Sequence, residues 1–139
     1  MLPVGRFGTF ARIGFASTWW KSLARILIVD DDSGFRKTLR LALRSSGYEI
    51  TDAGSGDEAL RSAEASVPDL ALVDWQLPGL DGLQTCLRLR TTYGLPVIMI
   101  SGNRSISRSA TLVAGASDFF EKPFVLQELL ASIQRLLRN

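Results

Sequence analysis

From residue 25 onward, short apolar segments alternate with amphipathic segments. The sequence predicts strands at RILIVD (25–30), YEIT (48–51), DLALVD (69–74), PVIMIS (96–101) and SDFFE (117–121). Strands that are apolar on both faces and separated by helices are typical of a parallel sheet covered on both sides. Five strand–helix pairs with right-handed crossovers predict an α/β, doubly wound (βα)5 fold, a three-layer sandwich around a five-stranded parallel sheet.

The predicted helices lie between these strands. Apolar positions recur at helical spacing from Phe35 to Ser46, and Gly47 is a stop signal. Ser55, followed three residues later by Glu58, predicts an N-cap. Three further helices are predicted at about 82–91, 105–115 and 124–138.

Length and composition narrow the function. The 139 residues suffice for one domain with a sizeable core. The chain has one cysteine, Cys86, and no histidine, so an intramolecular disulfide and catalysis by a histidine of this chain are excluded. No apolar run approaches the ~20 residues of a membrane span. We therefore expect a protein of the reducing cytoplasm, with no membrane span.

The basic residues are unevenly distributed. Residues 1–25 contain four basic and no acidic residues, whereas residues 26–139 contain 12 basic and 14 acidic ones. Residues 1–24 form a basic, aromatic leader, which we expect to be disordered or a start-site artefact, with an organelle-targeting or interfacial segment as the alternative. The domain proper is expected at 25–139, and no direct nucleic-acid binding is expected from it.

Polar residues follow four of the predicted strands. They are Asp30, Asp31 and Asp32 after the first, Asp74 at the end of the third, Ser101 at the end of the fourth and Lys122 after the fifth. In such sheets, ligands bind outside the carboxyl ends of the strands. Carboxylates without histidine or thiolate suit Mg²⁺ or Mn²⁺. A carboxylate beside such an ion can attack phosphorus and form an aspartyl phosphate.

In these segments the sequence resembles the receiver domain of bacterial response regulators, particularly single-domain, chemotaxis-regulator-like ones. The resemblance covers about residues 25–138 and is carried by ILIVDDD, LVDWQLPGLDG, PVIMISG and AGASDFFEKPF in this order. It implies a flavodoxin-like fold and a phosphoacceptor of a two-component phosphorelay. We expect a signalling switch and not an enzyme, because its only reactions are its own phosphorylation and dephosphorylation.

The resemblance also implies roles for single residues. Asp74 is the phosphoacceptor, and Asp30, Asp31, Asp74 and the backbone carbonyl of Gln76 hold Mg²⁺ (or Mn²⁺), Asp30 largely through a metal-bound water. Ser101 and Lys122 contact the phosphoryl group. Ser101 and Phe119 form the switch, and a cis peptide bond before Pro123 positions Lys122. Asp32 is expected to open the first helix, where a negative charge is favourable.

The implied partners are a sensor histidine kinase or histidine phosphotransfer protein as donor and a downstream protein target. That target reads the surface made by the last two helices and the fifth strand, through which a homodimer can also form. We expect a stand-alone receiver, with a fragment of a longer regulator as the alternative. The alternative function is a haloacid-dehalogenase-type phosphatase that uses Asp30 as nucleophile.

Overall fold

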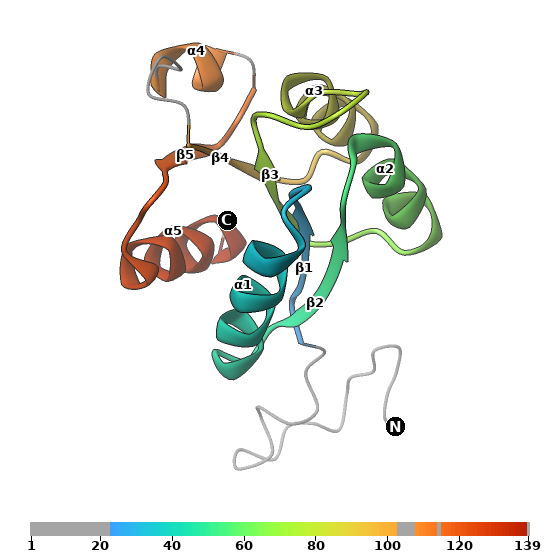
Figure 1. The fold of residues 1–139 in the computed structure, drawn as a ribbon. Coiled ribbons are helices and arrows are strands. Elements are labelled where there is room, and N and C mark those ends of the chain that lie inside the picture. Colours follow the sequence, from blue (N-terminus) through green and yellow to red (C-terminus); the bar gives the residue numbers. More distant parts are fainter. Residues whose placement is uncertain (1–22, 103–107, 114, 139) are drawn as a thin grey trace.

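The structure, a computed structural model, describes residues 23–102, 108–113 and 115–138. Five parallel strands form one sheet in the order β2-β1-β3-β4-β5 (Figure 1). The strands are β1 (Arg25–Val29), β2 (Glu49–Ala53), β3 (Leu70–Asp74), β4 (Val97–Ser101) and β5 (Asp118–Glu121). The helices are α1 (Ser33–Ser45), α2 (Gly56–Ala65), α3 (Gly82–Tyr93), α4 (Arg108–Val113) and α5 (Leu126–Arg138). The predicted fold class is confirmed, whereas the predictions for the leader concern residues almost all outside the described ranges.

Helices cover both faces of the sheet, with α1 and α5 on one side and α2 and α3 on the other (Figure 1). Because side chains alternate along a strand, Ile26 and Ile28 of β1 pack with Leu43 of α1 and Leu129 of α5. Leu27 and Val29 of the same strand belong to the opposite cluster, with residues of α2 and α3. β1 and β3 are thereby buried on both faces, and the positions of their ends are fixed.

The predicted capping residues shape the first two helices. Asp32 is the N-cap of α1, and its Oδ1 accepts hydrogen bonds from Gly34 N (3.0 Å) and Phe35 N (3.1 Å). Ser55 caps α2 by accepting from Glu58 N at 3.1 Å. Side-chain oxygens therefore bind backbone donors that the first turn of each helix leaves unsatisfied.

Most element boundaries differ from the predictions by one or two residues, and those of β2 and α5 have a structural explanation. β2 extends beyond residue 51 to Ala53, because Asp52 and Ala53 still pair with Ile28 and Val29 of β1. The Asp52 carboxylate is paired to Arg36 (3.3 Å) and Arg40 (2.8 Å) of α1. α5 begins at Leu126, two residues later than predicted. There, Val125 O accepts from the backbone of the first helical turn, so regular helical bonding starts after it.

The fourth helix was predicted over 105–115, and its described part is Arg108–Val113. Residues 103–107 and 114 lie outside the described residues. Gly115 has φ = 106°, a conformation that suits glycine after a helix, and its N–H donates to Leu112 O at 3.0 Å. The predicted stop at this glycine is confirmed.

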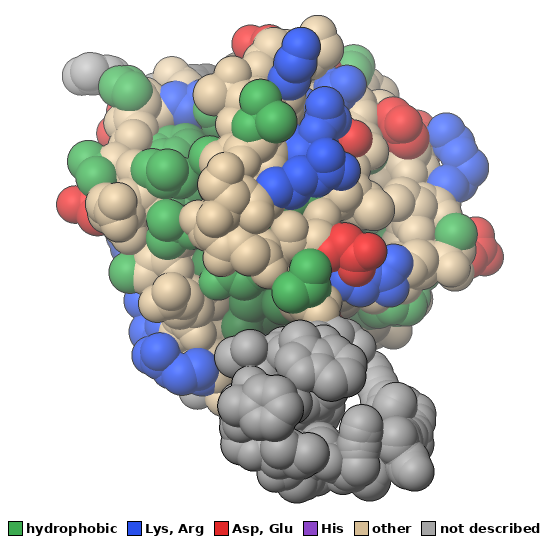
Figure 2. Space-filling view, turned by 90° about the horizontal axis from the view of Figure 1, so that it is seen from below, with side chains coloured by type: hydrophobic (Ala, Val, Ile, Leu, Met, Phe, Trp, Pro, Cys, Tyr) green, Lys and Arg blue, Asp and Glu red, His purple; other side chains and the backbone are tan. Residues whose placement is uncertain are grey.

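Figure 2 shows the side on which α1 and α5 lie in Figure 1. On this face, Lys and Arg side chains lie beside acidic and hydrophobic ones and not in one continuous basic surface. No helix in the described ranges combines the length and the apolar composition that crossing a membrane would require.

Candidate functional site

The strand order brings the predicted site residues to one edge of the sheet. β3 lies between β1 and β4, and β5 pairs with the other side of β4. Asp74, at the end of β3, is in register with Ile100, next to Ser101 at the end of β4. Lys122 N donates to Ser101 O at 2.8 Å, which ties the segment after β5 to β4. The polar residues after four strands therefore share one site.

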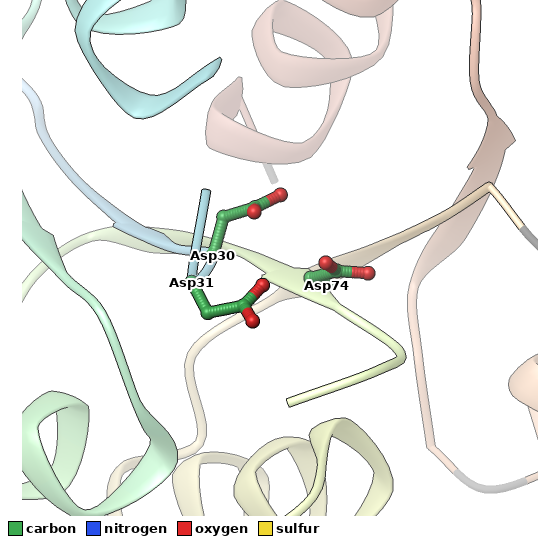
Figure 3. A group of neighbouring side chains, drawn as sticks. All are labelled: Asp30, Asp31 and Asp74. Carbon is green, nitrogen blue, oxygen red and sulfur yellow. The ribbon is translucent and has the colours of Figure 1, made fainter. Parts of the chain in front are cut away.

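Three carboxylates form the centre of this site. One carboxylate oxygen each of Asp30, Asp31 and Asp74 lie within 4.8 Å of one another (Figure 3). Asp30 and Asp74 are buried, with 2% and 7% of their surface exposed, whereas Asp31 is exposed. Two negative groups are thus held inside the fold and a third lies at its surface.

Lys122 supplies the positive charge. Its Nζ lies 2.8 Å from Asp30 Oδ2 and 3.7 Å from Asp74 Oδ2. Asp30 Oδ1 accepts from Asp32 N at 2.9 Å, so both oxygens of Asp30 are engaged. Asp74 Oδ1 accepts only a longer hydrogen bond among those described, from Gln76 N at 3.2 Å. The ammonium therefore neutralises Asp30 more than Asp74.

This unequal pairing affects the acidity of Asp74. Burial, followed by the negative charge of Asp30, raises the pKa of Asp74 to about 6, although the hydrogen bond from Gln76 and the charge of Lys122 oppose the shift. A bound cation would stabilise a buried carboxylate whose negative charge is only partly neutralised by its neighbours. At neutral pH this carboxyl group is nevertheless mostly ionised.

The chemistry of the donor set fits Mg²⁺. All three groups offer oxygen, the ligand that hard divalent cations prefer, and two of them belong to strand ends that the core holds in place. Three carboxylates repel one another, and a divalent ion between them relieves that repulsion. Asp30, Asp31 and Asp74 are therefore the residues that could hold the ion. The contribution of the Gln76 carbonyl stays a prediction.

The other predicted residues surround this centre. Ser101 is fully buried at the end of β4. The Lys122–Pro123 peptide bond is cis, as the resemblance implied. Phe119 is buried in the cluster on the α2–α3 face, and no contact between its ring and the carboxylates is among those described. The structure thus brings Ser101 beside the acid–lysine centre and places Phe119 in the adjoining core.

Two residues near the site were not predicted to contact it. Phe35 was read only as a core position of the first helix, yet Lys122 Nζ lies 4.1 Å from the centre of its ring. Arg36 Nη1 donates to Asp30 O at 2.6 Å and thereby holds the end of β1. Both residues lie in the first turn of α1, directly after the aspartates, and this position is the signal that sequence reasoning could have used.

Comparisons with known proteins point to one family. Residues 26–134 match the family model described as response regulator receiver domain. Response regulator MprA of Mycobacterium leprae is 46% identical over 117 residues, which are 83% of this chain and 51% of that protein. MprA of Mycolicibacterium vanbaalenii is 45% identical over the same length. The chain thus spans about half the length of the curated relatives it matches.

Solved structures show the same fold. A CheY-like receiver domain protein from Methanospirillum hungatei superposes with a TM-score of 0.79 at 34% identity, covering 84% of this chain and 95% of that one. A response regulator described as putative, from Chloroflexus aurantiacus, gives a TM-score of 0.78 at 39% identity over 85% of this chain and 100% of its own.

Proposed function

Because the chain belongs to the family of response regulator receiver domains, we propose that it accepts a phosphoryl group on Asp74 and thereby switches a protein-interaction surface. The observation that carries the assignment is the position of Asp74, which shares a cluster with Asp30 and Asp31 and has Lys122 Nζ 3.7 Å away. A carboxylate in this position has both a potential metal site and an ammonium beside it.

In the proposed reaction, a carboxylate oxygen of Asp74 attacks the phosphorus of a phosphohistidine. The phosphorus–nitrogen bond breaks, and its electron pair stays on the imidazole of the donor. Mg²⁺ bound by Asp30, Asp31 and Asp74 would neutralise charge on the phosphoryl oxygens. The positive charge of Lys122 would offset the same negative charge. Since this chain has no histidine, the donor is another protein, a sensor histidine kinase or a histidine phosphotransfer protein of the cytoplasm.

The proposed switch connects the site to the α4–β5–α5 surface. Ser101 and Phe119 would move toward the modified Asp74, shifting an equilibrium between two arrangements of this surface. A groove of about 430 Å³ lies there, with Arg108 of α4, Phe119 and Phe120 of β5 and Glu128 of α5 in its lining. A downstream protein, or a second copy of the chain, would bind on this side.

Labelling with a small phosphodonor tests the acceptor. With acetyl phosphate and Mg²⁺, the wild-type chain should gain one phosphoryl group by intact mass, and Asp74→Asn should gain none. Asp57→Asn is the matched control, because it removes an exposed carboxylate from the first turn of α2. Labelling that persists in Asp74→Asn would place the acceptor elsewhere.

The phosphatase alternative requires Asp30 as the nucleophile and Asp32 as the general acid. In the structure, both oxygens of Asp30 are engaged by Lys122 and the Asp32 backbone, and the Asp32 carboxylate caps α1. These contacts and the family match favour the receiver function. Turnover of an aryl phosphate that is lost in Asp30→Asn and kept in Asp74→Asn would favour the phosphatase.

A further inference from the structure

The ammonium of Lys122 has an aromatic neighbour as well as its two carboxylates. Nζ lies 4.1 Å from the centre of the Phe35 ring, over the ring face. A ring face carries negative electrostatic potential and attracts a cation at this distance. Lys122 is thus held by Asp30 at 2.8 Å and by the ring, and Asp74 lies further away at 3.7 Å.

The ring itself is held from two sides. Phe35 lies in the first turn of α1, where its backbone N–H donates to Asp32 Oδ1 at 3.1 Å. Its ring meets the Phe124 ring edge to face, with centroids 6.2 Å apart and planes at 88°. Phe124 meets Phe120 of β5 in the same manner at 6.1 Å. The position of Phe35 is therefore fixed both by α1 and by the segment that carries Lys122.

Phe35 and Lys122 both line an open groove. The groove has a volume of about 470 Å³, and its lining includes Phe35, Thr38 and Leu39 of α1 together with Lys122, Pro123 and Phe124. The Lys122 side chain is 24% exposed. A ring in this place limits the access of water to one side of the ammonium, which strengthens the attraction of Lys122 to the carboxylates.

We propose that Phe35 is a positioning residue for phosphoryl transfer, with its ring face keeping the Lys122 ammonium beside Asp30 and Asp74. The proposal rests on the proposed function of Asp74. The ring attracts the cation without an oxygen acceptor of its own, so Lys122 keeps N–H groups for oxygen acceptors on the side of Asp30 and Asp74. The ammonium can then turn from Asp30 toward phosphoryl oxygens on Asp74 while it remains over the ring.

The test replaces the ring but keeps an apolar side chain. Phe35→Leu removes the ring face, Phe35→Met repeats the change with another flexible apolar side chain, and Phe35→Tyr keeps the face. Phe124→Leu is the matched control, because it removes a neighbouring ring that no described contact joins to the Lys122 ammonium. Each variant is made in the full chain, with and without Lys122→Gln.

Two measurements follow. The ε-methylene protons of Lys122 should show an upfield ring-current shift by NMR in wild type, Phe35→Tyr and Phe124→Leu, and lose it in Phe35→Leu and Phe35→Met. At saturating Mg²⁺, labelling by acetyl phosphate should slow three- to tenfold in Phe35→Leu and Phe35→Met, and change less than twofold in the other two. In the Lys122→Gln background, Phe35→Leu should have no further effect.

Wild-type labelling rates in Phe35→Leu and Phe35→Met, or an equal slowing with and without Lys122, would overturn the proposal, since the ring would then act only in packing. If Asp74 is not the phosphoacceptor, the experiments give a different result. In that case Asp74→Asn would still be labelled, while the ring-current shift of Lys122 would continue to report the contact with Phe35.

Discussion

Lys122 Nζ and Asp30 Oδ2 lie 2.8 Å apart and join the end of β1 to the segment after β5. Because the ammonium lies 0.9 Å further from Asp74 Oδ2, at 3.7 Å, the carboxylate of Asp74, the proposed acceptor, is the less neutralised of the two buried ones. Without a ligand, the proposed site therefore carries negative charge that is only partly neutralised. This charge should lower the stability of the folded protein and favour the binding of a cation.

Asp74→Asn should stabilise the metal-free protein at pH 7–8. The folded-state pKa of Asp74, about 6, is above its ordinary value of 3.8, so the folded protein binds the proton more tightly. The protonated Asp74 contributes its full stabilisation of the folded state below about pH 4, and this contribution is lost as the pH rises through 6. Asparagine avoids that loss. At 1.36 kcal/mol per pKa unit, the shift from 3.8 to about 6 corresponds to a gain in folding stability of up to ~3 kcal/mol.

Urea denaturation in EDTA at pH 4, 5, 6 and 7.5 measures this gain. It should grow between pH 4 and pH 7.5 and shrink when Mg²⁺ is added, because the ion stabilises only the carboxylate form. A gain that does not depend on pH would contradict the assignment of the shift to Asp74.

Asp31→Asn should weaken Mg²⁺ binding at least tenfold, which corresponds to ~1.4 kcal/mol. Asp31 contributes an oxygen to the carboxylate cluster, and the substitution removes one negative charge from it. Asp32→Asn is the control, because the Asp32 carboxylate caps α1 and asparagine caps helices equally well. Calorimetric titration with Mg²⁺ should give an affinity within twofold of wild type for Asp32→Asn, and similar losses in both variants would contradict this division of roles.

Much of the site could be predicted because it follows from the order of elements along the chain. Apolar strands buried on both faces require a covered parallel sheet, and polar residues after those strands must then meet at one edge. Asp30, Asp31, Asp74 and Lys122 could be placed together on this basis. The order of the strands could not be read from periodicity, and the structure supplies it. The resemblance implied the role of each residue.

What could not be predicted depends on contacts between distant side chains. The preference of Lys122 for Asp30 over Asp74, and its position over Phe35, are set by rotamers of residues about 90 positions apart. β2 was predicted too short because Asp52 interrupts the apolar pattern, although it pairs with Ile28 of β1 and its charge is balanced by arginines of α1. Periodicity carries no information about such pairs.

Asp118→Asn should destabilise the protein by about 2–3 kcal/mol at neutral pH, since it weakens a buried charge-assisted network. Asp118 accepts from Ser132 Oγ (2.6 Å), Arg108 Nη2 (2.7 Å) and Arg135 Nη2 (3.1 Å), which joins α4, β5 and α5. Burial alone would raise the pKa of Asp118, but these hydrogen bonds and charges outweigh it and lower the pKa.

Because the folded-state pKa of Asp118 is lowered, the stability it contributes is present above 3.8 and is lost as the pH falls through the folded-state value. The cost of Asp118→Asn should therefore shrink in acid, as thermal denaturation at pH 7 and pH 3 would show. Glu49→Gln, which breaks the exposed pair with Arg25, should cost less than ~0.5 kcal/mol. Equal costs for the two variants would mean that the network does not stabilise the fold.

Gly82→Ala should disturb the proposed acceptor, Asp74, directly, because Gly82 begins α3 against the end of β3. A Cβ atom on Gly82 would lie 2.1 Å from Asp74 O and 2.7 Å from Trp75 Cα, and both obstacles are backbone. Gly82 N also donates to Trp75 O at 3.1 Å, so the close approach holds the turn after Asp74 in place. Relieving the clash must move the strand end that carries the acceptor carboxylate.

We expect Gly82→Ala to lower the free energy of unfolding by at least ~3 kcal/mol, which is at the high end for overpacking. We also expect it to weaken Mg²⁺ binding at least tenfold. Gly94→Ala is the control: Gly94 has φ = 68° but no atom within 4 Å of an added Cβ, so only the backbone penalty of about 1 kcal/mol applies. Urea denaturation and Mg²⁺ titration of both variants measure these effects. If both variants lost the same stability and kept the Mg²⁺ affinity of wild type, the backbone beside Asp74 would accommodate the added methyl group without displacing the site.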